Sequence, residues 1–307
     1  MENKNSISKT SEFFVSNLYG GFATQQELDA EYDVEKAVPD FLEYIHYFTK
    51  SSETARGLLE SRTVVSYGET LMERLTVYPA KNPDAPVMLF VHGGYWRLGI
   101  GDEYDFVALG PSQAGFTVVN ITYALTPVVN IPEMVRQVRS AIAWTAKNIS
   151  NFNGNPDSIF VAGHSAGAHL SAMAITTDWS AYGLPADTIK GVLAVSGLYD
   201  LEPVSQTFVQ PSVCITAEQI LSSSPILLIG QSNVPLTVVW GALETAAFQE
   251  QSYNYLKAWQ HAGNQADSLV VSNANHFNIL KGFETADGFL TREVLSLLEN
   301  SKSISTF

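Results

Sequence analysis

Cysteine is almost absent from this 307-residue sequence, in which Cys214 stands alone. A single cysteine cannot form an intrachain disulfide, so the fold does not require an oxidising compartment. No basic motif that would activate the thiol lies near Cys214, so we expect this side chain to pack in the structure.

Basic residues are also scarce, since 17 lysines and arginines face 31 acidic residues and give a formal net charge of −14 at pH 7. An acidic surface repels nucleic acid and anionic membranes, so neither is expected as a partner. We therefore expect the protein to bind a small-molecule substrate. A homodimer is compatible with these properties.

Long apolar runs and clusters of metal ligands are missing too. No run approaches the roughly 18 apolar residues of a membrane-spanning helix, and residues 1–6 lack the apolar core of a signal peptide. No cysteine–histidine cluster suggests a metal site, and no cofactor is expected. These absences predict a cytoplasmic location.

What is present is a regular alternation of strand-like and helix-like patterns. Hydrophobic residues make up 46% and charged residues 16%, in a chain long enough for one large domain. The alternation predicts an α/β fold with a mostly parallel central sheet and helices on both faces. The predicted strands cover residues 74–78, 87–91, 116–123, 158–162, 191–196, 236–240 and 268–272.

One G-x-S-x-G pentapeptide, Gly163-His164-Ser165-Ala166-Gly167, lies between a strand-like and a helix-like run. At such a turn the serine is strained and its hydroxyl is raised above the sheet edge, facing the positive end of the next helix. The pattern predicts Ser165 as a nucleophile. His164 lies beside it and is expected to contact substrate at the pocket wall.

A second loop, His92-Gly93-Gly94-Tyr95-Trp96, follows the predicted strand 87–91. In this fold class such a Gly-Gly loop supplies backbone N–H groups to an oxyanion hole, together with the residue after the nucleophile. We therefore expect Gly93, Gly94 and Ala166 to form that hole. Tyr95 and Trp96 are expected to bind substrate at the pocket mouth, with core packing as the alternative.

A nucleophilic serine needs a base and an orienting acid, in the chain order serine, acid, histidine. His276 follows the last predicted strand and a turn, whereas His261 lies late in an amphipathic helical run, so His276 is predicted as the base. Glu244 follows the predicted strand 236–240 and is predicted as the acid. The alternative acid, Asp200, follows the preceding strand.

The coarse organisation is one catalytic domain with two appendages. Residues 1–65 are predicted to form a helical extension near the pocket, and residues 66–307 the α/β-hydrolase domain. Residues 201–231 interrupt the alternation with a Ser- and Pro-rich stretch, so they are predicted to form a cap or lid over the site.

These motifs resemble the arylformamidase (kynurenine formamidase) branch of the α/β-hydrolase fold, within the esterases and lipases that carry an HGG loop. The matching stretches are spread over most of residues 70–300: His92 to Trp96, Gly163 to Leu170, Ser196 to Leu201, Glu244 with Phe248 and Gln251-Ser252, and His276-Phe277. Glutamate at position 244 departs from the animal members.

The resemblance implies a serine hydrolase that removes an N-formyl group from an aromatic amine, such as N-formylkynurenine, and releases formate. A carboxylesterase that acts on small or aryl esters with the same residues is the alternative. A binding protein without catalysis is a third reading of the same scaffold, since a fold does not fix a function.

Overall fold

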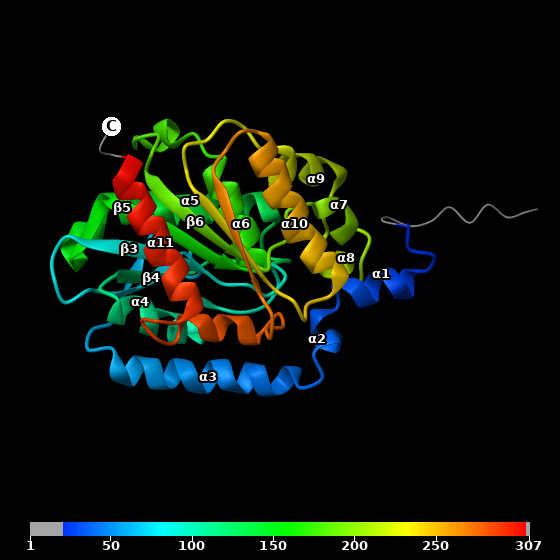
Figure 1. Ribbon diagram of the computed structural model, residues 1–307, viewed down its shortest axis with the longest axis horizontal. Helices are drawn as coiled ribbons and strands as arrows, with labels where there is room; N and C mark the ends of the chain where they lie inside the picture. Colours follow the sequence, from blue (N-terminus) through cyan, green and yellow to red (C-terminus); the bar gives the residue numbers. More distant parts are fainter. Residues whose placement is uncertain (1–20, 305–307) are drawn as a thin grey trace, which may run out of the picture.

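A computed structural model describes residues 21–304 and contains one eight-stranded sheet (Figure 1). The order of the strands across the sheet is β1-β2-β4-β3-β5-β6-β7-β8. Their bounds are β1 Thr63–Ser66, β2 Arg74–Tyr78, β3 Ala85–Val91, β4 Thr117–Thr122, β5 Gly154–His164, β6 Ile189–Val195, β7 Leu236–Gly241 and β8 Ala266–Val271.

The sheet is mostly parallel, as the sequence predicts. β1 pairs antiparallel with β2 and β2 antiparallel with β4, while the remaining five pairs are parallel. β4 and β7 are buried at every position, β6 at every position but one, and β3 at all but one position near its start, as in parallel sheets covered on both faces. Each of the seven predicted strands is present. β1 is an additional strand, and it lies across the predicted boundary at residue 65.

Helices cover both faces of the sheet. Both α6 (Ala166–Ile175) and α11 (Phe289–Ile304) contact β5 and β6. α5 (Ile131–Asn148) packs beside α6, and α4 (Leu109–Gln113) beside α11; α10 (Ala246–His261) contacts β7 and β8. In Figure 1 α11 crosses in front of the strands and α5 and α6 lie behind them. Short 3₁₀ helices lie between these elements: η2 Gly101–Ala108, η3 Ile149–Phe152, η4 Trp179–Tyr182 and η6 Asn278–Phe283.

α5 illustrates why these segments are helical. The side chain of Asn130 accepts a hydrogen bond from the backbone N–H of Glu133 and caps the helix, and Pro132 lies in the first turn, where its missing N–H is tolerated. Most of the buried side chains recur at helical spacing along one stripe. They are Ile131, Met134, Val135, Val138, Ala141, Ile142 and Thr145, and Gln137 and Ala143 are buried as well.

The N-terminal part of the described chain forms α1 (Gln25–Tyr32), α2 (Val34–Ala37) and α3 (Phe41–Leu58). α3 packs along η2 and lies beneath the sheet in Figure 1, while α1 contacts α10. Residues 1–20 of the predicted extension lie outside the described residues.

The segment predicted as a lid is made of short helices. They are α7 Leu201–Val204, α8 Gln210–Val213, α9 Ala217–Ser223 and the 3₁₀ helix η5 Pro225–Leu227. Cys214 ends α8 in a left-handed conformation with φ +55° and is exposed, so the expectation that it packs is wrong. Its thiol points to the carbonyl of Pro211 at the helix end rather than to the core.

Within residues 21–304, no helix combines the length and the apolar character needed to cross a membrane.

Candidate active site

The parallel strands bring five chain segments to one edge of the sheet. Val91 pairs with Gly163, His164 with Val195, Val195 with Val239 and Gly241 with Val271, so the carboxyl ends of β3, β5, β6, β7 and β8 lie in a row. The residues that follow them are His92, Ser165, Ser196, Ala242 and Ser272. Ligands of open α/β sheets bind at this edge.

Ser165 sits at a strained turn between β5 and α6. Its backbone has φ +55° and ψ −121°, a conformation that non-glycine residues rarely adopt. A β-carbon added at Gly167 would overlap the carbonyl oxygen of Val91, so only glycine lets α6 approach β3 this closely. The turn therefore holds the Ser165 hydroxyl at the sheet edge, as predicted for an elbow.

His276 lies next to that hydroxyl. Its Nε2 is 3.0 Å from Ser165 Oγ, and its Nδ1 is 2.9 Å from Glu244 Oε2. The loop that carries it is fixed by Asn275, whose side-chain oxygen accepts hydrogen bonds from the backbone N–H groups of Phe277 and Asn278. The ring of Phe248 packs edge-on against the imidazole, with centroids 4.8 Å apart.

Glu244 accepts three hydrogen bonds with its carboxylate. Oε1 accepts from Ser196 Oγ and from the backbone N–H of Gly241, both at 2.6 Å, and Oε2 faces His276. The side chain does not cap α10, which is preceded by Thr245 at the N-cap position. Buried and triply bonded, the carboxylate holds His276 with Nδ1 protonated and Nε2 free to accept a proton from Ser165.

The two alternative residues are used elsewhere. The Asp200 carboxylate accepts from the backbone N–H of Glu202 and caps α7. His261 is exposed in the last turn of α10. The structure thus brings Ser165, Glu244 and His276 together and leaves both alternatives outside that contact.

The Gly-Gly loop lies against the serine. A β-carbon added at Gly93 would be 3.0 Å from Ser165 Cβ, and one at Gly94, where φ is +109°, would overlap the carbonyl oxygen of Leu98. Ala166 is the first residue of α6, so its N–H has no partner within the helix. Two of the three residues predicted for an oxyanion hole, Gly93 and Ala166, therefore lie next to Ser165, and Gly94 follows Gly93 in the same loop.

The residues predicted to bind substrate are buried. Trp96 has no exposed surface, and its indole N–H donates to His169 Nδ1 at 3.2 Å. Tyr95 donates its hydroxyl to the carbonyl of Tyr32 in α1. The structure therefore shows the alternative for Trp96, which is core packing behind the loop.

His164 is hydrogen-bonded to the loop that carries His276. Its Nε2 lies 2.8 Å from the carbonyl oxygen of His276. Burial, with the nearby His276 ring as a smaller cause, holds the pKa of His164 well below the usual histidine range, so this ring is neutral.

The N-terminal helices pack against residues beside the site. Phe41 and Tyr44 of α3 contact the ring of Phe277, next to His276, and Glu31 of α1 accepts from the backbone N–H of Ala247 at 2.9 Å. Ser165 is almost buried, with 2% of the residue exposed. Four hollows in the described part of the chain lie elsewhere, and none is lined by Ser165, Glu244 or His276.

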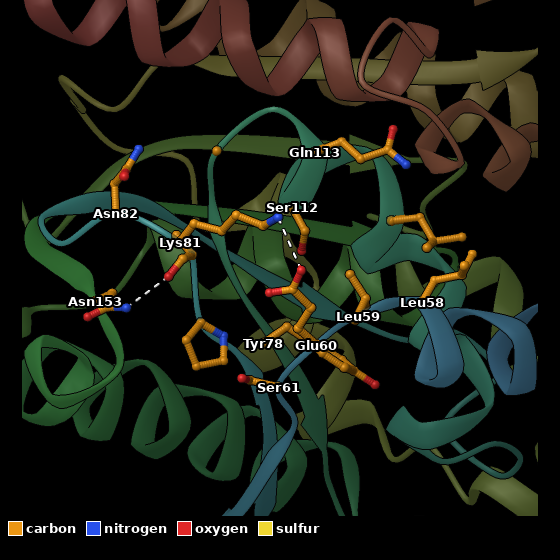
Figure 2. A pocket seen from close by; sticks show the side chains of 14 residues that line it. Leu58, Leu59, Glu60, Ser61, Tyr78, Lys81, Asn82, Ser112, Gln113 and Asn153 are labelled. Atoms are coloured by element: carbon orange, nitrogen blue, oxygen red, sulfur yellow. Dashed lines mark hydrogen bonds and ion pairs between the residues drawn. The ribbon is translucent and has the colours of Figure 1, made fainter.

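A groove of about 660 Å³ lies at the opposite end of the sheet (Figure 2). Its lining includes Leu58, Tyr78, Ser112 and Asn153, and Lys81 forms a 3.2 Å ion pair with Glu60 inside it. None of the predicted site residues lines this groove, so it is separate from the candidate active site.

Known proteins resemble this chain in sequence and in fold. A family profile described as BD-FAE matches residues 75–259. Kynurenine formamidase from Danio rerio is 33% identical over 265 residues, covering 84% of this chain and 89% of the relative; the Salmo salar enzyme is 35% identical over 82% and 87%. The chain belongs to the kynurenine formamidase family of α/β-hydrolases.

Members of the wider esterase group resemble this family member less closely. Esterase LipC from Mycobacterium tuberculosis is 30% identical over 75% of the chain and 62% of the relative. A crystal structure from Silicibacter sp., provisionally described as a thioesterase, has a TM-score of 0.78 and 28% identity over 88% of this chain and 99% of that one. An esterase from Pyrobaculum calidifontis, with a TM-score of 0.69 and 19% identity over 90% and 97%, shares the fold. The chain is a hydrolase of this fold.

Some residues around the site of this kynurenine formamidase family member escape sequence reasoning. Ser196 and Phe248 lie in stretches that match the formamidase branch, but the sequence does not show that Ser196 donates to Glu244 or that Phe248 packs on His276. Tyr32, which accepts from Tyr95, carries no local signal, because the contact joins distant segments.

Proposed function

We propose that this hydrolase cleaves an aryl N-formyl amide, of the N-formylkynurenine type, and releases formate. Ser165 is the nucleophile, His276 the general base and acid, and Glu244 the residue that orients His276. One observation carries the proposal: an unbroken hydrogen-bonded chain runs from Ser165 Oγ through His276 to Glu244, and all three side chains are buried.

The reaction proceeds by acyl transfer in two halves. His276 Nε2 takes the proton of Ser165 Oγ while a bond forms between that oxygen and the formyl carbon. The C–N bond then breaks, and the amine leaves with the proton from His276. Water attacks the formyl-serine with His276 again as base, and formate leaves as the serine regains its proton.

The charge that develops on the formyl oxygen needs donors. The N–H groups of Gly93, Gly94 and Ala166 are proposed to supply them, since Gly93 and Ala166 lie next to Ser165 and Gly94 follows in the same loop. Removing one donor of an oxyanion hole typically costs about 10²–10³ in kcat.

Two observations favour the formyl group over larger acyl groups. The relatives with 33% and 35% identity along most of their length are named kynurenine formamidases. In addition, Gly93 and His276 lie against Ser165, which is only 2% exposed, so the smallest acyl group is the best fit.

A carboxylesterase acting on small or aryl esters is the second candidate, favoured by the 30% identity to Esterase LipC. The two are separated by comparing kcat/KM for N-formylkynurenine with kcat/KM for short p-nitrophenyl esters. The formamidase proposal expects the formamide to be the better substrate, and a strong preference for the esters would replace it.

The nucleophile is tested by Ser165→Ala. We expect turnover to fall to the background rate that the remaining site supports. The melting temperature should be nearly unchanged, because the Ser165 hydroxyl contributes little to the packing of the fold. Labelling of the wild type but not of the variant by a fluorophosphonate probe checks the same assignment. Substantial turnover by the variant would exclude a serine mechanism.

We also propose that the protein acts in the cytoplasm on a small molecule. The net charge of −14 and the single cysteine, which is exposed and unpaired in the described chain, support this location.

A further inference from the structure

The loop that carries Gly93 and Gly94 continues into two residues with unusual backbone conformations. Tyr95 has φ +49° and Trp96 has φ +56°, both in the left-handed region. Non-glycine residues held there cost on the order of 1–3 kcal/mol each, so neighbouring groups must hold the loop in this conformation.

Several hydrogen bonds hold Trp96. Its carbonyl oxygen accepts from the backbone N–H of Thr126 at 2.8 Å and from the Thr126 hydroxyl at 3.1 Å. Its indole N–H donates to His169 Nδ1 at 3.2 Å, and the imidazole meets the indole edge-on with centroids 5.1 Å apart. The side chain of Trp96 is thus attached to α6, the helix that begins beside the nucleophile.

His169 is attached to a third element as well. Its Nε2 is 2.7 Å from the carbonyl oxygen of Ser223, the last residue of α9. A carbonyl only accepts, so Nε2 carries the proton and Nδ1 is left to accept from Trp96. The imidazole is fully buried, and burial lowers the pKa of His169 to about 4, which keeps this tautomer neutral.

We propose that His169 is a positioning residue that holds the oxyanion loop in its active conformation and joins it to α9 of the 201–231 segment. The inference rests on the proposed serine mechanism. One imidazole connects three elements: the helix after Ser165, the loop with Gly93 and Gly94, and the end of α9.

The bond between Trp96 and His169 matters because the loop lies very close to Ser165. Trp96 is only three residues from Gly93, whose added β-carbon would lie 3.0 Å from Ser165 Cβ. Oxyanion donors act only when they lie about 2.7–3.1 Å from the developing charge, so a small displacement of this loop removes their contribution. His169 touches neither the substrate nor the reacting atoms, and it acts through Trp96.

The test compares three variants of the full-length protein on the substrate preferred by the wild type. His169→Leu removes both hydrogen bonds of the imidazole, and we expect kcat to fall on the order of 10²-fold, with KM changed little, as for the loss of an oxyanion donor. His169→Gln can accept from Trp96 and donate to Ser223 at once, so it should restore most of the lost kcat. Thr145→Val removes a buried hydroxyl in α5 and serves as the matched control, with kcat unchanged.

Trp96→Phe provides an independent measurement. If the indole–imidazole bond carries the effect, Trp96→Phe lowers kcat to a similar extent, and the double variant with His169→Leu loses little more than either single variant. Fully additive losses would show that the two residues act separately and would overturn the inference.

A merely structural role has a different signature. Active sites are counted by complete fluorophosphonate labelling, and thermal unfolding is measured in parallel. If His169→Leu lowers the number of active sites while kcat per site stays at the wild-type value, His169 does not position the loop. Retained turnover by Ser165→Ala would instead refute the proposed function, so the two failures are distinguishable.

Discussion

Replacing Glu244 by glutamine changes one atom in the candidate site and should reverse the tautomer of the base. In the structure Glu244 Oε1 accepts from the backbone N–H of Gly241 and from the Ser196 hydroxyl, and Oε2 faces His276 Nδ1. The backbone N–H cannot become an acceptor, so the glutamine oxygen must stay at the Oε1 position. The new NH₂ group then points at His276.

An NH₂ group facing Nδ1 requires that nitrogen to be unprotonated. The proton moves to Nε2, which lies 3.0 Å from Ser165 Oγ and can then no longer accept the serine proton. Restoring the active tautomer leaves two donors facing each other, at about 1–3 kcal/mol. Losing the charge-assisted bond to the imidazolium adds about 1.5–3 kcal/mol.

The total of about 3–6 kcal/mol corresponds to a loss in kcat of roughly 10²–10⁴-fold. Steady-state kinetics normalised to the folded fraction would measure it, with Asp200→Asn as the control because that carboxylate caps α7. The control should lose some stability, about 1 kcal/mol for a helix cap, and keep its kcat. A folded Glu244→Gln protein within tenfold of the wild-type kcat, or a crippled Asp200→Asn protein, would refute the reasoning.

Two further predictions concern stability. Gly167→Ala should lower the free energy of unfolding, measured by chemical denaturation, by about 1–3 kcal/mol or more, because the new β-carbon would overlap the Val91 carbonyl. The control Gly57→Ala in α3, which has open space around it, should be neutral or stabilising. Equal effects of the two substitutions would contradict this prediction. Burial lowers the pKa of His92 and His169 to about 4, below the value of about 6.5 in the unfolded chain. Because the unfolded chain then binds more protons, stability falls as the pH drops from about 6.5 towards 4, by about 2 kcal/mol per imidazole between pH 7 and 5. The loss between these pH values should be about 2 kcal/mol smaller in His169→Gln, and an unchanged loss would show that His169 is not titrated on unfolding.

Much of the fold follows from the sequence because buried parallel strands are continuous apolar runs. β3, β4, β6, β7 and the second half of β5 are buried almost throughout, and the carboxyl ends of β5, β7 and β8 meet at one edge, which brings Ser165, Glu244 and His276 together. β1 has four residues at the edge of the sheet and is mostly exposed, so it leaves no such pattern. For this reason the predicted N-terminal extension, residues 1–65, ends inside β1 rather than before it.

The contacts behind the site are less predictable. Trp96 and His169 are 73 residues apart, and His169 and Ser223 are 54 apart, so no local pattern connects them. Tyr95 and Trp96 were expected at the pocket mouth because aromatic residues are common both in cores and in binding sites. Left-handed backbone angles at these positions direct the indole into the core, and such angles cannot be read from side-chain type.

The packing of the N-terminal helices against late parts of the chain has a consequence for folding during synthesis. Tyr44 stacks on Phe277, and Glu31 accepts from Thr245 and Ala247, partners that are synthesised more than 200 residues later. At about 5–20 residues per second, a ribosome needs roughly 10–45 s to reach them. Throughout that interval Phe41 and Tyr44 lack their native partner Phe277. The complete site therefore arises only in the last stage of translation, and a chain released before residue 277 cannot acquire it.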